Sequence, residues 1–282
     1  MIQTYINIPY KCLLPLVAKP ELLKAFVIYG KLKMMFSNGA VHNIKSRKKE
    51  LAKRLHISEN TFRKYLGVLK SNFIVSIDEN DILRLGGRYE LYNTLKIEAN
   101  FSETKKRIAD KWYRVEKKDF NIEELQFLAL KHKRNNIDYK NTERIKNSIV
   151  KSFGTIICPK IKQRIESKAR KTAKTIVSNS QENFAESFNP NSKYGFVDNN
   201  LSGTSIAKLI GKKSKITGNR LMHKLAQKNK ISYTKRDIRI QELTHFTNIK
   251  IIQEENILPC LIKKEYGVNT LFLRVPNSWT IL

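Results

Sequence analysis

A cluster of polar and cationic side chains lies within seven residues of the sequence. The cluster consists of Ser58, Asn60, Thr61, Arg63 and Lys64. Hydroxyl, amide and guanidinium groups can hydrogen-bond the edges of bases, and an ammonium group can pair with a phosphate. These residue types therefore suit contact with a nucleic acid, provided that one rigid element presents them on the same side.

The residues around this cluster predict two short helices joined by a tight turn. Leu51 and Leu55 are four residues apart and share one face of the first helix, and Ala52 is small enough to let a second helix approach. Ser58 is the expected N-cap of the second helix, because its hydroxyl can accept a hydrogen bond from a backbone N–H of the first turn. The apolar side of that helix consists of Phe62, Tyr65, Leu66 and Leu69.

A small hairpin is expected directly after the helix pair. Residues 73–77 are strand-like, residues 78–81 form a polar turn, and residues 82–85 alternate apolar and polar side chains. Arg84 in the second strand adds a further cation.

A helix that begins near Pro20, the helix pair and the hairpin together resemble the winged helix-turn-helix DNA-binding proteins, over a stretch that ends near Tyr92. In that family the second helix of the pair enters the major groove, and the hairpin touches the backbone or the minor groove. The resemblance implies DNA contacts by the cluster and by Arg84. His56 occupies the turn position where the family often has glycine. A helical hairpin in an ordinary core, or a winged helix that contacts a protein, are the alternatives.

The pattern recurs later in the chain. Residues 206–210 match residues 51–55 at an offset of 155, and residues 214–225 match residues 58–69 at an offset of 156. The extra residue falls in the turn, where a loop absorbs a change of length. Gly211 supplies a turn glycine, whereas Gly218 stands in place of Phe62 and costs about 1 kcal/mol inside a helix. A second DNA-binding module is therefore expected, with a chance pattern in a helical core as the alternative.

The predicted DNA contacts of the second copy lie on its second helix and its wing. They are Ser214, Lys215, Thr217, Asn219, Arg220, His223, Lys224, Lys235, Arg236 and Arg239. The wing is expected as a hairpin of residues 231–233 and 238–240 around a basic turn. Residues 257–279 are expected to form a final hairpin that packs on this module, with its turn at 266–269. Its closing residues, 271–279, resemble hairpin ends of phage and plasmid DNA-binding proteins.

The segment between the two copies divides by composition. Residues 102–178 are predicted to be mostly helical, with Ile108, Trp112 and Val115 on one face. The stretch from Lys160 to Lys174 holds seven basic residues and one glutamate, as either a solvated helix face or a nucleic-acid contact. Residues 179–200 hold six asparagines and one basic residue, which is typical of a linker, although a long surface loop is the alternative.

The expected fold is thus mainly α with small β wings. Two winged helix-turn-helix modules, at 1–92 and 201–282, are joined by a basic helical segment at 93–178 and an Asn-rich linker at 179–200. The charge supports a polyanionic partner, because 54 Lys and Arg against 25 Asp and Glu leave a net charge of +29 in 282 residues.

Other classes of protein fit the sequence less well. A membrane partner is not expected, since no apolar run approaches the ~18–20 residues of a spanning helix. Cys12, Cys158 and Cys260 are odd in number and far apart, which fits neither a disulfide framework nor a zinc site. The sequence also lacks a phosphate-binding glycine loop and the paired histidines of a metalloprotease. We therefore expect no enzyme, no metal and no cofactor.

The sequence predicts a sequence-specific binder of double-stranded DNA in the cytoplasm of a bacterial host. Paired winged modules resemble initiators of phage or plasmid replication, which would also contact the replication machinery. A transcription regulator of a mobile element, working with the transcription machinery, is one alternative. The other is a structural protein that binds nucleic acid without sequence preference.

Overall fold

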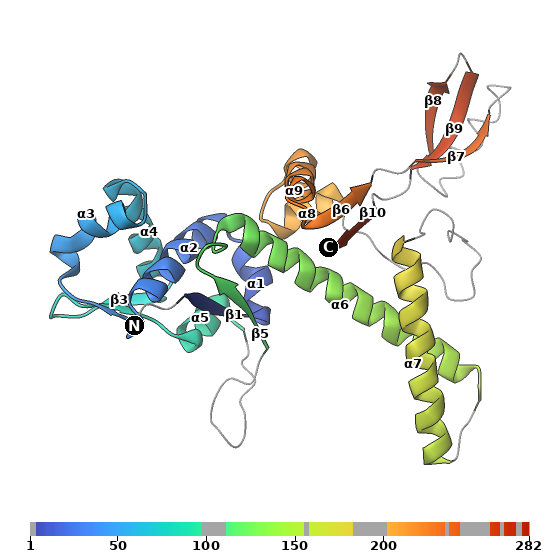
Figure 1. Cartoon of the computed structure of the whole chain (residues 1–282), viewed down its shortest axis with the longest axis horizontal. Helices are drawn as coiled ribbons and strands as arrows, with labels where there is room; N and C mark the ends of the chain where they lie inside the picture. Colours follow the sequence, from blue (N-terminus) through green and yellow to red (C-terminus); the bar gives the residue numbers. More distant parts are fainter. Residues whose placement is uncertain are drawn as a thin grey trace. The chain divides into compact units, whose positions relative to one another are not determined.

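The structure is a computed structural model that describes residues 4–97, 111–154, 158–182, 202–234, 237–242, 260–265, 268–274 and 278–281. These residues are mainly helical and carry small antiparallel sheets, as expected (Figure 1). The chain divides into two compact units, of which unit 1 comprises residues 1–133 and 206–214, and unit 2 comprises residues 134–205 and 215–282. This division differs from the module boundaries expected from the sequence.

The predicted helix pair and its hairpin are present in unit 1. The three helices are α2 (Pro20–Met35), α3 (Ile44–Arg54) and α4 (Glu59–Ser71), and Pro20 lies in the first turn of α2. Strands β3 (Val75–Ile77) and β4 (Leu83–Leu85) form the hairpin. A short strand that the sequence did not reveal, β2 (Ala40–Val41), pairs with the other side of β4. The apolar sides of the helices are buried, with Phe26, Leu51, Phe62, Leu66 and Leu69 each at most 4% exposed.

A second part of unit 1 brings together the first residues of the chain and the segment that follows the hairpin. It contains β1 (Tyr5–Pro9), α1 (Tyr10–Val17), α5 (Arg88–Leu95) and β5 (Trp112–Glu116). Strands β1 and β5 pair antiparallel along their full length. The prediction of a helix through Trp112 and Val115 is therefore wrong, and Ile108 lies outside the described residues. The strand forms because Val115 turns inward beside Ile6 and Ile8, a pairing partner more than 100 residues away in the sequence.

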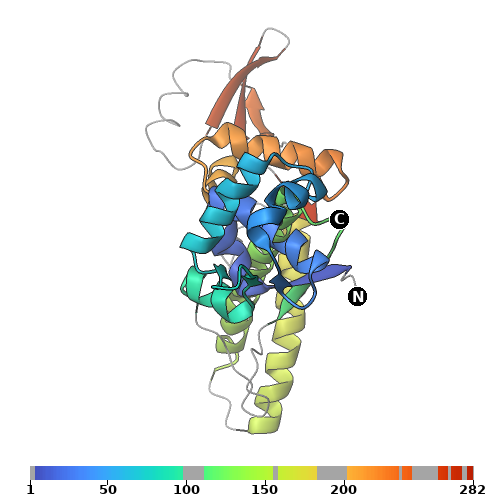
Figure 2. The same cartoon turned by 90° about the vertical axis from the view of Figure 1, so that its left-hand side faces the viewer.

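Two long helices follow, and the predicted helical character of this segment is confirmed. Helix α6 (Ile122–Lys151) runs from unit 1 into unit 2, and α7 (Pro159–Glu182) belongs to unit 2. Ala173 and Val177 of α7 pack with Ile145 of α6 in a small apolar cluster. Figure 2 shows the ribbons of these two helices, in yellow and green, beside each other. Helix α7 continues through Glu182, so the segment expected to be a linker begins as helix, and residues 183–200 lie outside the described residues. None of the described helices is long and apolar enough to cross a membrane.

The described residues after position 201 contain α8 (Gly203–Leu209), α9 (Lys215–Gln227) and five strands. The strands are β6 (Ile231–Thr234), β7 (Asp237–Glu242), β8 (Cys260–Glu265), β9 (Val268–Arg274) and β10 (Ser278–Ile281). A hairpin of β8 and β9 lies in the segment where the final hairpin was predicted, but Val268 and Asn269, which were expected in its turn, belong to β9.

The predicted wing of the second copy does not form as a hairpin. Strand β6 pairs with β10 from the chain end, and β7 pairs with β9 instead. Local alternation identified the strands correctly, but the choice of partner depends on segments that come later in the chain.

Candidate nucleic-acid interface

Helix α4 begins where the sequence placed its cap. The Ser58 hydroxyl accepts a hydrogen bond from the backbone N–H of Thr61 at 3.1 Å, and the two hydroxyls lie 2.8 Å apart. Phe62 and Leu66 are buried, whereas Asn60 and Arg63 are exposed on the opposite side. Ser58 and Thr61 therefore cap the start of the helix, and the side chains of Asn60 and Arg63 are accessible to a ligand.

The three predicted cations of the first copy are held by carboxylates. The Arg63 Nε lies 2.9 Å from Glu59 Oε1, the Lys64 Nζ lies 3.0 Å from Glu21 Oε2, and the Arg84 Nη2 lies 2.9 Å from Asp78 Oδ2. Hydrogen bonds from Lys24 and Lys64 hold the pKa of Glu21 below its ordinary value. All three cationic side chains are 61% exposed, and exposed pairs are worth only about 0–1 kcal/mol. A polyanion can therefore replace the carboxylates as the partner of these cations at little cost in free energy.

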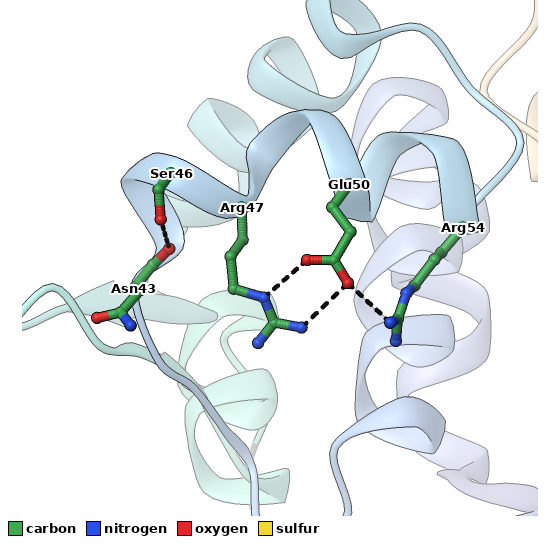
Figure 3. A network of polar contacts seen from close by, with 5 residues as sticks. All are labelled: Asn43, Ser46, Arg47, Glu50 and Arg54. Carbon is green, nitrogen blue, oxygen red and sulfur yellow. Dashed lines mark hydrogen bonds and ion pairs between the residues drawn. The ribbon is translucent and has the colours of Figure 1, made fainter.

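Helix α3 carries a basic surface that sequence reasoning left out. Its eleven residues hold six cations and one acid, and the cations are Lys45, Arg47, Lys48, Lys49, Lys53 and Arg54. Figure 3 shows the acid, Glu50, between two of them, 3.0 Å from the Arg47 Nε and 2.7 Å from an Arg54 nitrogen. At the start of the helix the Ser46 hydroxyl donates to the Asn43 carbonyl at 3.1 Å. The dense basic run at residues 45–49, within the first half of α3, was the sequence signal for this surface.

The acidic hairpin turn has a structural role. Asp81 accepts hydrogen bonds from the first two backbone N–H groups of α3, through its carbonyl oxygen for Ile44 (3.1 Å) and through Oδ2 for Lys45 (3.0 Å). Asp78 accepts the N–H of Ile82 at 2.9 Å, and this bond together with Arg84 lowers the pKa of the Asp78 carboxyl. The turn thereby anchors the hairpin to the start of the basic helix.

The turn geometry of the helix pair occurs twice. His56 has φ = 55° and Gly211, 155 residues later, has φ = 66°. Each donates its N–H to the carbonyl three residues earlier, at 3.1 Å in both cases. The residues that follow the second helix repeat as well, since Phe73 and Asn229 are 156 residues apart and have φ = 56° and 53°.

The length of the second helix and the buried positions repeat with the same offsets, whereas the first helices differ in length, with 11 residues in α3 and 7 in α8. Helices α4 and α9 both contain 13 residues, and the extra residue lies in the turn before α9, as predicted. The buried positions also correspond: Leu51, Ala52 and Leu55 with Ile206, Ala207 and Ile210, and Leu66 and Leu69 with Met222 and Leu225. The two segments thus share backbone conformation as well as residue pattern.

The predicted contacts of the second copy are only partly assembled. Ser214, Lys215, Arg220, His223 and Lys224 are exposed, and Thr217 is half-buried. Asn219 is half-buried too, because its side chain lies where a Cβ on Gly203 would project.

The wing residues of the second copy are not brought to α9 by a β6–β7 hairpin. Arg239 lies in β7 opposite Phe272 of β9, and the turn residues Lys235 and Arg236 lie outside the described residues.

Gly211 allows a test of the repeated turn. A Cβ at this position would overlap the Ala18 carbonyl oxygen, and φ = 66° strains any residue with a side chain. We expect Gly211→Ala to lower the free energy of unfolding by about 2–5 kcal/mol, because the left-handed backbone costs about 1–2 kcal/mol and the overlap about 1–3 kcal/mol. His56→Ala is the matched control. It should change the free energy of unfolding by less than about 0.5 kcal/mol, because histidine and alanine both carry a Cβ. Urea denaturation measures both, and equal effects would contradict the close contact at Gly211.

No family model, curated protein or solved structure matches this chain. Among the described residues, no group of three or more His, Cys, Asp or Glu side chains could hold a metal ion. The chemistry that the site does offer is hydrogen bonding and cationic pairing, from two helices of equal length that each follow a tight turn.

Proposed function

We propose that the chain is a sequence-specific binder of double-stranded DNA. The observation that carries this proposal is the exposed side of α4, where Asn60 and Arg63 stand on a helix whose start is capped by Ser58 and whose other side is buried. A helix presented in this way can enter the major groove, and Arg and Asn are the side chains that pair bidentately with guanine and adenine. The basic α3 then lies where the first helix of such a pair crosses the DNA backbone.

The repeated turn supports a role that needs two contacts on one DNA molecule. We favour an initiator of phage- or plasmid-type replication in a bacterial cytoplasm, with two reading helices, α4 and α9, in one chain. A transcription regulator of a mobile element is the second candidate. A protein that binds nucleic acid without sequence preference is the third, and it is favoured only by the net charge of +29.

Selection of bound duplexes from a random pool tests the proposal directly. Enrichment of a defined sequence, with two half-sites at a regular spacing, is the expected result. Recovery of unenriched duplex would favour binding through charge alone, and failure to recover any duplex would rule out the proposal.

Arg63 separates base reading from phosphate contact. We expect Arg63→Ala to weaken binding to the selected site by about 1–3 kcal/mol and binding to random duplex much less, because a bidentate base contact is lost only on the right sequence. Fluorescence anisotropy on both duplexes measures the difference. Replacing Lys160 and Lys162 of α7 with Ala is the control, since exposed lysines that meet phosphates affect all sequences alike. An equal loss on both duplexes for Arg63→Ala would make Arg63 a phosphate contact.

A further inference from the structure

The β1–β5 pair presents one apolar face and one aromatic and cationic face. Its register places Ile6, Ile8 and Val115 on the face that is buried in the core. The other face carries Tyr5 and Asn7 from β1, and Trp112, Arg114 and the acid Glu116 from β5. Tyr5, Asn7, Trp112 and Arg114, together with Arg88 at the start of α5, form a surface that we call the aromatic–arginine face.

Each aromatic ring of this face lies against a guanidinium group. The Arg88 guanidinium is 4.0 Å from the centre of the Trp112 ring, and the Arg114 guanidinium is 3.8 Å from the centre of the Tyr5 ring. Both arginines are exposed, and Trp112 keeps 37% of its surface accessible. Trp112 is therefore exposed and Tyr5 half-buried, and each ring already has an arginine against it.

Rings and guanidinium planes in this arrangement match the chemistry of an unpaired nucleic-acid strand. Bases stack on aromatic side chains and on arginine planes, and arginine also pairs with the phosphates between them. In a duplex the base faces are covered by their neighbours, so only an unpaired strand can use such a surface. We propose that the aromatic–arginine face binds single-stranded DNA, with bases stacked on Trp112 and Tyr5 and with Arg88 and Arg114 on the strand's phosphates.

The surroundings of the face suit an anionic strand. A hollow of about 260 Å³ adjoins it and is bordered by Asn7, Arg88 and the half-buried Lys33. The acid at the edge of the face, Glu116, lies opposite Tyr5, and its exposed carboxylate is 3.3 Å from the Lys118 ammonium group. The face uses β1, β5 and α5, whereas the proposed duplex contacts use α3, α4 and α9, so the two sites can be tested separately.

Substitutions at Trp112 distinguish stacking from a merely structural role. The full chain is titrated into fluorescein-labelled oligo-dT and, in parallel, into a blunt duplex. We expect Trp112→Leu to weaken oligo-dT binding about tenfold, equivalent to about 1.4 kcal/mol and to one stacked base, while duplex binding changes less than about twofold. Trp112→Phe keeps an aromatic ring and should retain oligo-dT binding within about threefold. Phe153→Ala, which removes an exposed aromatic ring after α6, should leave oligo-dT binding unchanged.

The ligand itself provides the second test. An abasic strand of the same length has the phosphates without the bases, so it should bind at least about tenfold more weakly than oligo-dT. Equal binding of the abasic strand, an equal loss in the Leu and Phe variants, or an equal loss on duplex and single strand would each overturn the proposal. Binding to oligo-rU tenfold tighter than to oligo-dT would overturn the assignment to DNA. If Trp112→Leu does not fold, as judged by circular dichroism, the abasic strand and Trp112→Phe still decide. Loss of duplex binding alone would count against the proposed function and not against this face.

Discussion

The affinity of the chain for duplex DNA should fall by about 10³–10⁵-fold between 50 and 200 mM salt. We expect the two proposed reading helices, α4 and α9, and the basic α3 to neutralise about six to ten phosphates together. Each neutralised phosphate adds about −0.9 to the slope of log affinity against log salt. The ion pairs of Arg63, Lys64 and Arg84 are exposed, so they do not keep these cations from the DNA. Fluorescence anisotropy over this salt range measures the slope, and a slope shallower than about −3 would mean that the basic surface meets another partner.

Substitutions on α3 test which cations contribute to that slope. Lys45 and Lys49 are exposed, and replacing each with Gln should make the slope shallower by about one. Lys117→Gln removes the same charge from the turn after β5 and should leave the slope unchanged. If all three substitutions change the slope equally, the duplex does not lie along α3.

Charge reversal on α9 should cost the chain its second DNA contact. Lys215 and Arg220 are exposed, and replacing both with Glu opposes any approach of α9 to phosphates. When two linked modules bind one molecule, the second event is effectively intramolecular and can raise affinity by about 10²–10⁴-fold. On a duplex with two half-sites, we expect the affinity of the double variant to be lower by a factor of this order. In footprinting, the double variant should protect one patch where the unsubstituted chain protects two. The patches should lie one or two helical turns apart, at about 10–10.5 base pairs per turn.

Reversal of Lys160 and Lys162 on α7 is the matched control. It changes the net charge by the same amount, and both residues are exposed. A small loss on all duplexes is expected for this control, with both patches kept. An unchanged footprint in the α9 variant would mean that α9 does not read DNA, and the replication-initiator proposal would lose its main support.

Much of the first module follows from short-range patterns in the sequence. The cap at Ser58, the apolar spacing of Phe62, Leu66 and Leu69, and the polar turn at 78–81 all correspond to observed elements. These features depend on residues within a few positions of each other, so their physics is local. The sequence also predicted the exposed Asn60 and Arg63, but not that Glu59 holds Arg63 or that α3 carries the larger basic surface.

The sequence by itself determined the two helix pairs, α3 with α4 and α8 with α9, each joined by a short turn. His56 and Gly211 take the same left-handed turn, because a short loop between two amphipathic helices leaves the backbone few alternatives. Only the tertiary structure decided which strands pair. Trp112 and Val115 become strand because β1 lies beside them, and β6 takes β10 in place of the adjacent β7. Strand pairing joins residues far apart in the chain, and alternation of side chains marks a strand without naming its partner. The pairing of β5 with β1 places Trp112 in a strand, where its ring lies next to Arg88. The aromatic–arginine face therefore could not be predicted from the sequence.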